Sequence, residues 1–385
     1  MNKMILKKLY LREDLQIFFN TGQNYIIGKN NTGKTTIFNI MQYVLGLKRV
    51  DINSEEIYST AIEPYIECQF GREVYKISRK FGSNEITFQG DINVIVNADS
   101  YELNDLYAKL LNISFENELN FNNDNINNDH SSIDIIKMSF LSEIELSKTY
   151  LNRGNNYYKI LGYNEDYLKL IKNDISSLKN ELKFETKSLK TIEQYKESVE
   201  NTLKTRYVTK QEEITKILED EYSIFRNKYL NKTKLLHNAE EVYEKELRNF
   251  KDSINNEISK LNPYFLKIIK EISPITNSLV GSDLQHVIEL KNMRNMSIGQ
   301  RVLLLWALHI TLCRNEVQNG LGMLITDSIL PKVDIATMKS IRNKISNITK
   351  NGELQYIEFC TENSYVPKES VVFEMPSKRG GGIFE

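Results

Sequence analysis

The sequence has 385 residues, and its 50 lysines and arginines almost balance its 51 aspartates and glutamates. This balance excludes a chain that binds nucleic acid through its overall charge, because any such contact must come from a local patch. The cysteines, Cys68, Cys313 and Cys360, form no C-x-x-C pair, which argues against a disulfide framework and a cysteine zinc site. The longest apolar run, 302–313, is too short to span a bilayer. We therefore expect a cytoplasmic protein without a signal peptide or a membrane-spanning helix.

Two strands are expected near the start, over 4–11 and 15–19, and a phosphate-binding motif follows them. Residues 28–36 read G-K-N-N-T-G-K-T-T and fit the pattern G-x-x-x-x-G-K-[ST]. The apolar run 25–27 predicts a buried strand entering this loop, and 36–41 predicts an amphipathic helix leaving it. Glycines at both ends of the loop let successive backbone N–H groups point inward, and the helix N-terminus adds a partial positive charge.

The motif predicts a site for a nucleoside triphosphate. Lys34 is expected to reach the outer phosphates, and the Thr35 hydroxyl is expected to bind Mg²⁺. The loop residues predicted to hold the nucleotide are Gly28, Asn31, Gly33, Lys34, Thr35 and Thr36. A chance glycine-rich turn is the alternative, and the strand before the loop and the helix after it argue against one.

From Pro64 onward the pattern changes to short strands separated mostly by glycine-containing turns, which predicts an antiparallel meander. The expected strands are 65–70, 73–78, 85–88 and 92–96. A helix is expected over 100–111, with Ser100 as its N-cap. The stretch 116–132 is rich in Asn and Asp and predicts a mobile surface loop, after which 133–146 is apolar again.

A long segment, 166–261, contains neither proline nor glycine and carries apolar residues in heptad spacing. In its first half the heptad positions are Leu168, Ile171, Ile175, Leu178, Leu182, Leu189, Ile192, Val199 and Leu203, interrupted by Glu185 and Lys196. The second half repeats the pattern and changes phase beyond Tyr243, which is typical of a stutter. With a reversal near 205–209, the two halves predict an antiparallel coiled-coil hairpin, which Pro263 is expected to close. A helical bundle packed on the core is the alternative.

The C-terminal part contains further motifs in a defined order. Ser297-Ile298-Gly299-Gln300 comes just before a strongly helical run and matches S-x-G-Q. The apolar strand predicted over 321–327 ends in Asp327, and Asp334 follows it by seven residues. Each motif alone is weak, because S-x-G-Q occurs in ordinary helix caps and most apolar strands ending in aspartate bind nothing.

In the order of P-loop, coil, S-x-G-Q, strand with aspartate and second aspartate, the chain resembles the SMC-like ABC ATPases, such as RecF, RecN, the SbcC-type break-repair ATPases and related bacterial defence ATPases. The resemblance implies an α/β, ABC-type P-loop ATPase head whose two lobes are residues 1–163 and 262–385, with the antiparallel coiled-coil hairpin 164–261 inserted between them. It implies ATP and Mg²⁺ as cofactors, with Asp327 as the Walker B aspartate that holds Mg²⁺ through water.

The resemblance also implies how two such chains would meet. ATP would lie between two heads in a head-to-head homodimer or heterodimer. The residues of one head that would contact the other head's nucleotide are Ser297, Gly299, Gln300 and Asp334. DNA and an effector or accessory subunit are the further partners that the resemblance implies.

Catalytic accessories of that family are missing from this sequence. The residue after Asp327 is Ser328, where the family has the glutamate that activates water. No histidine follows the strand expected over 356–360, and no glutamine occurs between Gln89 and Gln194. We therefore expect a catalytic position, Asp327 with Ser328, at which ATP is bound and turned over slowly or not at all. The alternative is an active, DNA-stimulated ATPase motor in which another acid replaces the glutamate, the choices being Glu362, Glu143 and Asp334.

The basic residues available for a DNA contact are scattered: Lys48, Arg49, Arg72, Lys76, Arg79 and Lys80. Such charges are more often a solvated face than a DNA site, so DNA binding is inferred mainly from the resemblance. The leading interpretation is a nucleotide-gated sensor or scaffold in DNA repair or anti-phage defence. A membrane-transporter subunit is disfavoured by the long coiled insertion, and a GTPase by the absence of an N-K-x-D motif. The final residues, 377–385, are expected to be disordered or to form a short docking peptide.

Overall fold

The computed structural model describes residues 2–47, 63–113, 131–142, 154–163, 166–205, 210–272, 283–288, 296–314, 316–327, 334–361 and 365–375. The chain divides into two compact units: a head, Met1–Asn164 with Ile254–Glu385, and a coiled coil, Glu165–Ser253. Several sequence predictions concern residues outside the described ranges. They include most of the expected mobile loop, the turn of the coil at 206–209, the end 377–385, and Lys48, Arg49, Glu143, Ser328 and Glu362.

Six strands of the head form an antiparallel sheet in the order β2-β1-β4-β5-β6-β7. Their bounds are β1 Met4–Arg12, β2 Leu15–Phe18, β4 Tyr65–Phe70, β5 Glu73–Ser78, β6 Glu85–Gln89 and β7 Val94–Asn97. Side chains alternate along these strands, so one face of the sheet is buried and the other meets solvent. In β4, for example, Ile66, Cys68 and Phe70 are buried while the residues between them are half-buried. The predicted meander is confirmed, although β7 begins at Val94 rather than at 92.

Five strands form a second sheet, in the order β11-β3-β10-β9-β8, and each neighbouring pair in it is parallel. Their bounds are β3 Gln23–Ile27, β8 Phe140–Ser142, β9 Met323–Asp327, β10 Gln355–Cys360 and β11 Val371–Glu374. Strands from both ends of the chain therefore build one sheet. Because the carboxyl ends of parallel strands meet at one edge, the residues that follow these strands gather there.

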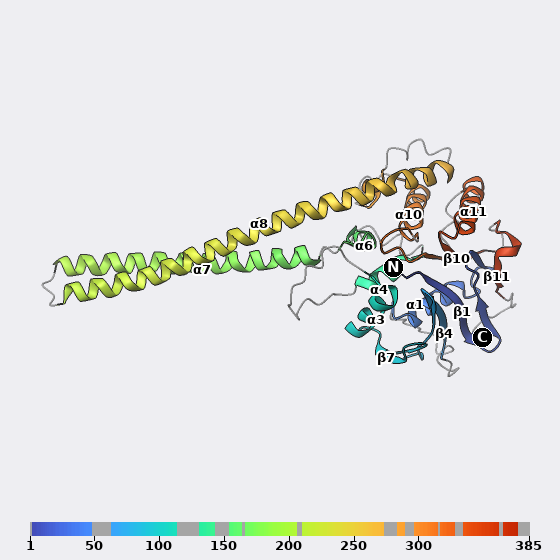
Figure 1. Ribbon diagram of the computed structural model, residues 1–385, viewed down its shortest axis with the longest axis horizontal. Helices are drawn as coiled ribbons and strands as arrows, with labels where there is room; N and C mark the ends of the chain where they lie inside the picture. The colour runs from blue at the N-terminus through green and yellow to red at the C-terminus, as the bar shows by residue number, and fades with distance from the viewer. Residues whose placement is uncertain are drawn as a thin grey trace. The chain divides into compact units, whose positions relative to one another are not determined.

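Helices cover both faces of the parallel sheet. Helix α1, Lys34–Val44, lies between the two sheets, since it contacts β9 and β10 of one and β4 of the other. Its Phe38 packs edge to face against Phe359 of β10. Helix α11, Ile335–Lys350, contacts β3 and β10 from the opposite face. In Figure 1, α11 and α10 (Ile298–Leu312) lie on one side of β10, and the antiparallel sheet lies on the other.

A charged pair is buried between α11 and the parallel sheet. Arg342 donates both terminal nitrogens to Glu358, one of them at 2.8 Å, and both side chains are almost fully buried. The Tyr356 hydroxyl donates to the same carboxylate at 2.8 Å and lies 3.1 Å from Thr326 Oγ1. The Arg342 guanidinium also lies 4.6 Å from the centre of the Tyr25 ring. Burial raises the pKa of Tyr25 and Tyr356, so both phenols stay protonated at neutral pH.

Shorter helices complete the described head: α3 Tyr101–Leu111, α4 Ser131–Met138, α6 Gly154–Ile160 and α9 Leu284–Ile288. Ser100 caps α3 as predicted, because its hydroxyl accepts a hydrogen bond from the Leu103 N–H at 3.3 Å. The prediction of a surface loop through residue 132 is wrong at its end. Ser132 is buried in α4, and its hydroxyl donates to the Asn104 carbonyl at 2.6 Å.

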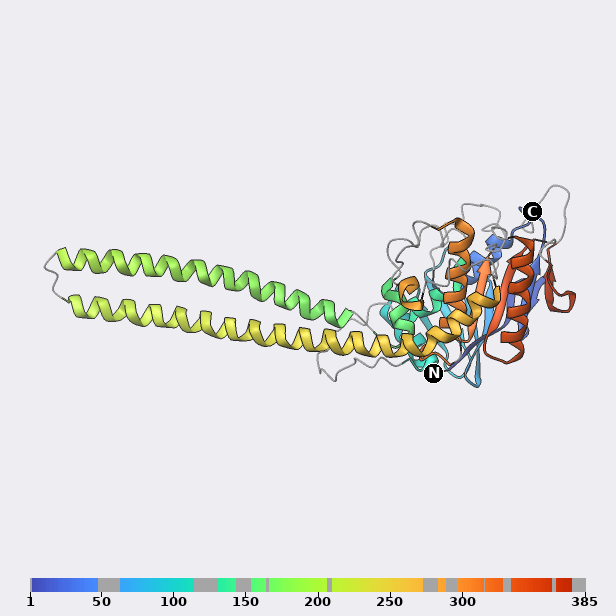
Figure 2. The ribbon, with the colours of Figure 1, turned by 90° about the horizontal axis from the view of Figure 1, so that it is seen from above.

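In the coiled coil, α7 (Asp166–Thr205) and the first part of α8 (Gln211–Ile272) run side by side in both views (Figures 1 and 2). Lys232 of α8 pairs across the seam with Glu185 at 3.0 Å and with Glu181 at 3.2 Å. The predicted antiparallel hairpin is confirmed, and these charges in the seam favour one register over its alternatives. None of the helices in the described ranges combines the length and the apolar character that a bilayer-spanning segment needs.

The sequence predicts that Pro263 closes the coil, but helix α8 runs through this proline and continues to Ile272. A proline inside a helix removes one backbone hydrogen bond and costs about 3 kcal/mol. Burial of the turns that follow offsets this cost, because Phe265, Ile268 and Ile269 are buried in the head. Proline alone is therefore a poor end signal where the next two turns carry core residues.

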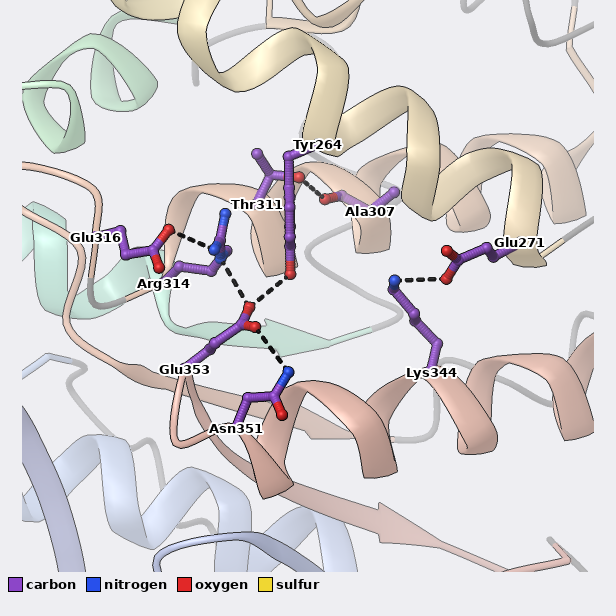
Figure 3. Close-up of polar contacts among 9 residues, drawn as sticks. All are labelled: Tyr264, Glu271, Ala307, Thr311, Arg314, Glu316, Lys344, Asn351 and Glu353. Atoms are coloured by element: carbon purple, nitrogen blue, oxygen red, sulfur yellow. Dashed lines mark hydrogen bonds and ion pairs between the residues drawn. The ribbon is translucent and has the colours of Figure 1, made fainter.

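A polar cluster also binds the last turns of α8 to the rest of the head (Figure 3). The Tyr264 hydroxyl donates to the Glu353 carboxylate at 2.9 Å, and Arg314 Nε donates to the same carboxylate at 3.1 Å. The Arg314 guanidinium lies 3.5 Å from the centre of the Tyr264 ring, and burial raises the pKa of that tyrosine. Nearby, Lys344 of α11 pairs with Glu271 of α8. The cluster joins α8 to the end of α10 and to the residues just before β10.

Candidate nucleotide site

The loop between β3 and α1 lies at the carboxyl edge of the parallel sheet. The Gly28 N–H donates to the Cys360 carbonyl at 3.3 Å, which holds the start of the loop beside β10. Asn31 and Gly33 have positive φ values of 61° and 96°. Left-handed residues set among right-handed ones turn successive N–H groups to one side and form an anion-binding nest. Gly33 is the N-cap of α1 and offers no capping side chain, so the helix N-terminus is available to a phosphate.

Lys34 is held inside this loop. Its side chain is buried, and its Nζ donates to the carbonyls of Gly28 at 2.7 Å and of Lys29 at 2.6 Å. These bonds keep the ammonium group beside the nest, where it can make a charge-assisted hydrogen bond to a phosphate oxygen. The nearby Lys29 side chain is exposed. Only one of the two lysines in the loop is therefore placed for a ligand.

Gly28 packs closely against Met375, the residue that follows β11 (Val371–Glu374). A Cβ added to Gly28 would lie 2.5 Å from Met375 Cβ and 2.9 Å from Thr32 Oγ1. Met375 is fixed there, because its N–H donates to the Ile27 carbonyl at 2.8 Å. Glycine is needed at this position for packing as well as for the curl of the backbone.

Asp327 is the last residue of β9 and lies at the same edge as the loop. In the sheet register it is opposite Phe359 of β10 and Ser142 of β8. Paired residues of neighbouring strands point to the same face, and Phe359 faces α1 because it contacts Phe38. The Asp327 carboxylate therefore lies on the face of the sheet that α1 covers, and Asp327 is only 5% exposed. The structure brings Asp327 and the P-loop to one edge, and their roles in binding stay predictions.

Oxygen atoms suited to Mg²⁺ are present at this edge. Thr35 is exposed in the first turn of α1, and its hydroxyl has no hydrogen-bond partner among the described residues, whereas the next residue, Thr36, is half-buried. Mg²⁺ takes oxygen ligands in an octahedron and keeps several waters. A hydroxyl from Thr35 and a carboxylate from Asp327 fit that preference, and these two residues would hold the ion together with phosphate oxygens and water.

The S-x-G-Q motif forms a capping box at the start of α10. The Gln300 N–H donates to Ser297 Oγ at 3.3 Å, and the Ser297 N–H donates to Gln300 Oε1 at 3.0 Å. This is the ordinary helix cap that the sequence leaves open as an alternative. The cap leaves the positive helix end in place, and Gly299 in the first turn has no side chain to cover it. Ile298, which lies between Ser297 and Gly299 in the chain, is 57% exposed.

Asp334 caps α11 in a similar way. Its carboxylate accepts hydrogen bonds from the Thr337 N–H at 3.0 Å and from the Thr337 hydroxyl at 2.6 Å. The bond from the Thr337 side chain is the largest cause that lowers the pKa of Asp334 below its usual value. Such a carboxylate is a weaker base, which disfavours Asp334 as a replacement for the missing glutamate. The hydrogen bonds of Ser297, Gln300 and Asp334 all lie within their own helices, so the structure does not join them to this chain's P-loop.

Arg79 is wrong as a DNA contact, because its charge is used inside the head. It is 3% exposed, and it donates from Nε to the Ser83 carbonyl at 2.9 Å and from Nη1 to the Tyr43 carbonyl at 3.0 Å. Its guanidinium also lies 4.0 Å from the centre of the Tyr43 ring. The basic residues of that region that remain exposed are Arg72, Lys76 and Lys80.

Sequence reasoning missed residues that the structure places at this edge of the sheet: Cys360 and Met375 beside the loop, and Ser142 opposite Asp327. They belong to no motif. Their shared signal is weak: each stands at or just after the end of a short strand of the parallel sheet. Which strands are neighbours could not be read from the chain, so the pattern alone could not place them together.

Neither a family model nor a curated protein matches this chain. Solved structures do. The Smc head domain with an extended coiled coil from Pyrococcus furiosus, bound to the C-terminal domain of ScpA, is 13% identical, covers 94% of this chain and 90% of its own, and has a TM-score of 0.52. An SmcHead bound to the C-winged helix domain of ScpA is 12% identical, covers 93% of this chain and 90% of its own, and has a TM-score of 0.48. The Smc head domain of Pyrococcus yayanosii, with a coiled coil and joint, is 12% identical, covers 93% of this chain and 92% of its own, and has a TM-score of 0.42. At this level of identity the Pyrococcus furiosus match shows the fold.

Proposed function

Because this chain has the fold of an SMC-like ABC ATPase head with an inserted coiled-coil hairpin, we propose that it binds ATP with Mg²⁺ at the P-loop. The observation that carries the proposal is the shared edge of β3, β9 and β10. There the nest, the Lys34 ammonium, the free Thr35 hydroxyl and the Asp327 carboxylate come together from both ends of the chain. Each supplies what a metal-bound triphosphate needs: N–H donors, a cation and oxygen ligands.

The second part of the proposal is that ATP draws two heads together. Ser297 and Gly299 stand at the N-terminus of α10, and Asp334 stands at the N-terminus of α11. None of the three is hydrogen-bonded to the P-loop of its own chain. The two capping residues are each followed by an exposed isoleucine, Ile298 at 57% and Ile335 at 54%. Helix ends that offer positive charge to a phosphate beside apolar side chains fit a surface that a second head covers.

Hydrolysis is proposed to be slow or absent at this site. The residue after Asp327 is Ser328, which is not basic enough to activate water at neutral pH. Loss of a general base typically lowers a rate by about 10²- to 10⁴-fold. The chain would then act mainly by binding ATP and so altering the state of its partner. Its own S-x-G-Q motif could complete a site on a catalytic head.

For the wider role we propose a cytoplasmic sensor or scaffold that engages DNA in a repair or antiviral defence complex. The Smc head of Pyrococcus furiosus carries a bound ScpA domain, which supports an accessory or effector subunit for this head too. The second candidate is a DNA-stimulated ATPase motor, and only turnover separates the two.

The first experiment is ATP binding and steady-state ATP turnover by the purified chain, with and without linear duplex DNA. Lys34→Ala should lose ATP binding, whereas Lys29→Ala, which changes an exposed lysine of the same loop, should keep it. Binding that depends on Lys34, with turnover no higher than in Lys34→Ala, supports the ATP-binding scaffold. DNA-stimulated turnover that Asp327→Asn abolishes would establish the motor instead. Equal ATP binding by Lys34→Ala and the wild type would overturn the site.

A further inference from the structure

The solvent face of the antiparallel sheet carries a group of aromatic rings and lysines that no function above uses. Strand alternation places Leu6, Leu9 and Ile17 on the buried face, and their neighbours on the solvent face. We call one group of these neighbours the aromatic–lysine patch: Lys8 and Tyr10 of β1, Phe18 of β2, Tyr65 of β4 and Lys76 of β5. It spans four adjacent strands of the sheet.

The rings and cations of the patch contact one another across the strands. Tyr10 and Tyr65 are opposite each other in the register and stack with their ring centres 4.7 Å apart. Lys8 Nζ lies 5.1 Å from the centre of the Phe18 ring and 5.6 Å from that of Tyr65. Lys76 Nζ lies 4.4 Å from the centre of the Tyr65 ring. The patch is thus a continuous surface of alternating aromatic and basic groups.

The lysines of the patch keep their charge free for a ligand. Glu67 of β4 is opposite both Lys8 and Lys76 in the register, yet neither ammonium makes an ion pair with a described carboxylate. Both rest over rings instead, an arrangement that leaves their N–H donors without a strong acceptor. Since Lys76 is exposed, it can swing away from the ring at little cost.

The rings of the patch are not core residues. Phe18 is 63% exposed on the edge strand β2, and Tyr10 and Tyr65 are half-buried. Large apolar groups gathered on an exposed sheet face mark binding surfaces more often than structural ones. Adjacent strands lie about 4.8 Å apart, so rings on β2, β1 and β4 span roughly 10 Å, enough for two stacked bases.

We propose that the aromatic–lysine patch binds single-stranded nucleic acid, with bases stacked on Phe18 and the tyrosine pair and phosphates at Lys8 and Lys76. An antiparallel sheet face with exposed aromatic residues recognises unpaired bases in this way, because every base offers a face to stack on. Duplex DNA fits less well, since its bases are already stacked and two lysines neutralise few phosphates. The inference rests on the DNA engagement proposed above and assigns it a surface and a strand type.

The test is the affinity of the full chain for a labelled oligothymidylate of about 20 nucleotides, measured by fluorescence anisotropy at several salt concentrations. Phe18→Ala and Tyr65→Ala should each weaken binding about 5- to 100-fold. Replacing Lys8 and Lys76 together by Ala should flatten the dependence of log affinity on log salt by about 1.4, because each single-strand phosphate contact contributes about 0.7.

Two matched controls lie on the same sheet outside the patch. Ile95→Ala removes an equally exposed apolar side chain from β7, and Lys3→Ala removes an exposed lysine just before β1. Both should leave affinity and salt slope unchanged. Thermal unfolding of each variant shows whether it folds, and Phe18→Leu, which keeps an apolar group without an aromatic face, separates stacking from simple burial.

The outcomes separate the patch from the proposed function. If the wild type binds the oligonucleotide and the patch variants bind it equally well, the patch is wrong while DNA engagement stands. Tighter binding of duplex than of single strand, unaffected by Phe18→Ala, also overturns the patch. If the wild type binds no nucleic acid, both the patch and the proposed DNA engagement fail. ATP binding, measured on the same samples with Lys34→Ala beside them, decides the nucleotide site independently.

Discussion

The two sets of residues assigned to the nucleotide differ sharply in how the chain holds them. Lys34 and Asp327 are 6% and 5% exposed, and both lie at the edge of a buried parallel sheet. Ser297 and Asp334 are exposed, and each only caps its own helix. The first set is assembled inside one head, whereas the second is presented on the surface, where the proposed second head would contact it.

The two sets also differ in the residues that pack beneath them. Below the P-loop edge, one residue before Phe359 of β10, the Arg342–Glu358 pair ties α11 to the sheet, and the Tyr356 hydroxyl donates a further hydrogen bond to Glu358. Arg342 Nε has no hydrogen-bond partner among the described residues, but the bonds of the two terminal nitrogens hold the buried pair in place, and the pair positions β10, whose end lies at the site. The surface set has only local caps behind it. Substitutions in the core beneath the first set should therefore lower the stability of the head. Substitutions in the second set should weaken the proposed pairing of two heads.

The largest expected effect follows from breaking the buried pair. Arg342→Met leaves Glu358 buried without its cation, which should lower the free energy of unfolding by about 3–5 kcal/mol. Urea denaturation measures this change. Lys344→Met on the same helix removes a pair with the half-exposed Glu271, and it should cost no more than about 1 kcal/mol. Equal losses of unfolding free energy in the two variants would show that the buried Arg342–Glu358 pair stabilises the head no more than the Lys344–Glu271 pair does.

Gly28→Ala should break the loop with a smaller effect on folding. The new Cβ would meet Met375 Cβ at 2.5 Å, so β11 or the loop must shift, and ATP affinity should fall at least about tenfold, or 1.4 kcal/mol. Calorimetric titration with Mg-ATP measures this. Gly22→Ala, at the other end of β3, has its nearest contact at 3.9 Å and should bind as the wild type does. A Gly28→Ala chain that binds Mg-ATP with wild-type affinity would contradict the close packing of Gly28 against Met375.

Ser297→Ala tests the surface set. Losing the cap should cost about 1 kcal/mol of stability, leave ATP affinity of the single head unchanged, and weaken the ATP-dependent pairing of heads. Analytical ultracentrifugation with and without Mg-ATP measures pairing. Ser100→Ala removes a cap with the same 3.3 Å bond from α3 and should cost similar stability without affecting pairing. If both variants pair like the wild type, the start of α10 does not form the contact between heads.

What the sequence could predict follows from how local each signal is. The P-loop, the Ser100 cap and the heptads of α7 and α8 depend on residues within a few turns of one another, and the structure contains all of them. Strand order in the parallel sheet depends on pairings between distant segments, such as Tyr356 of β10 with Gln23 of β3. Short strands such as β8 and β11 carry too few residues for a periodic signal.

The wrong predictions have the same physical origin. The usual surface location of arginine favours a solvated Arg79, but the carbonyl of Tyr43, 36 residues away, and that of Ser83, 4 residues away, accept its hydrogen bonds inside the head. A proline predicts a break, so Pro263 is expected to close the coil, but core residues beyond it in α8 compensate for the lost hydrogen bond. In both cases a tertiary contact outweighs a local preference, and no local pattern reports that contact.

The smallest expected effect concerns the charge of Asp334. Its pKa is lowered from a usual value of 3.8 by bonds that exist only in the folded state, so its charge adds stability above that value and loses the contribution as the pH falls further. The group is exposed, and solvent screening keeps the contribution to at most about 0.5 kcal/mol. Asp334→Asn keeps the cap, because Asn caps as well as Asp, and removes only the charge. The wild type should therefore be slightly more stable than Asp334→Asn at pH 7, and this advantage should shrink as the pH falls below 3.8, as judged by urea midpoints. The same variant tests catalysis: if Asp334 were the base that replaces the missing glutamate, Asp334→Asn would abolish any ATP turnover. Because the hydrogen bonds from Thr337 weaken it as a base, we expect turnover to be unchanged, which assigns Asp334 to the surface set.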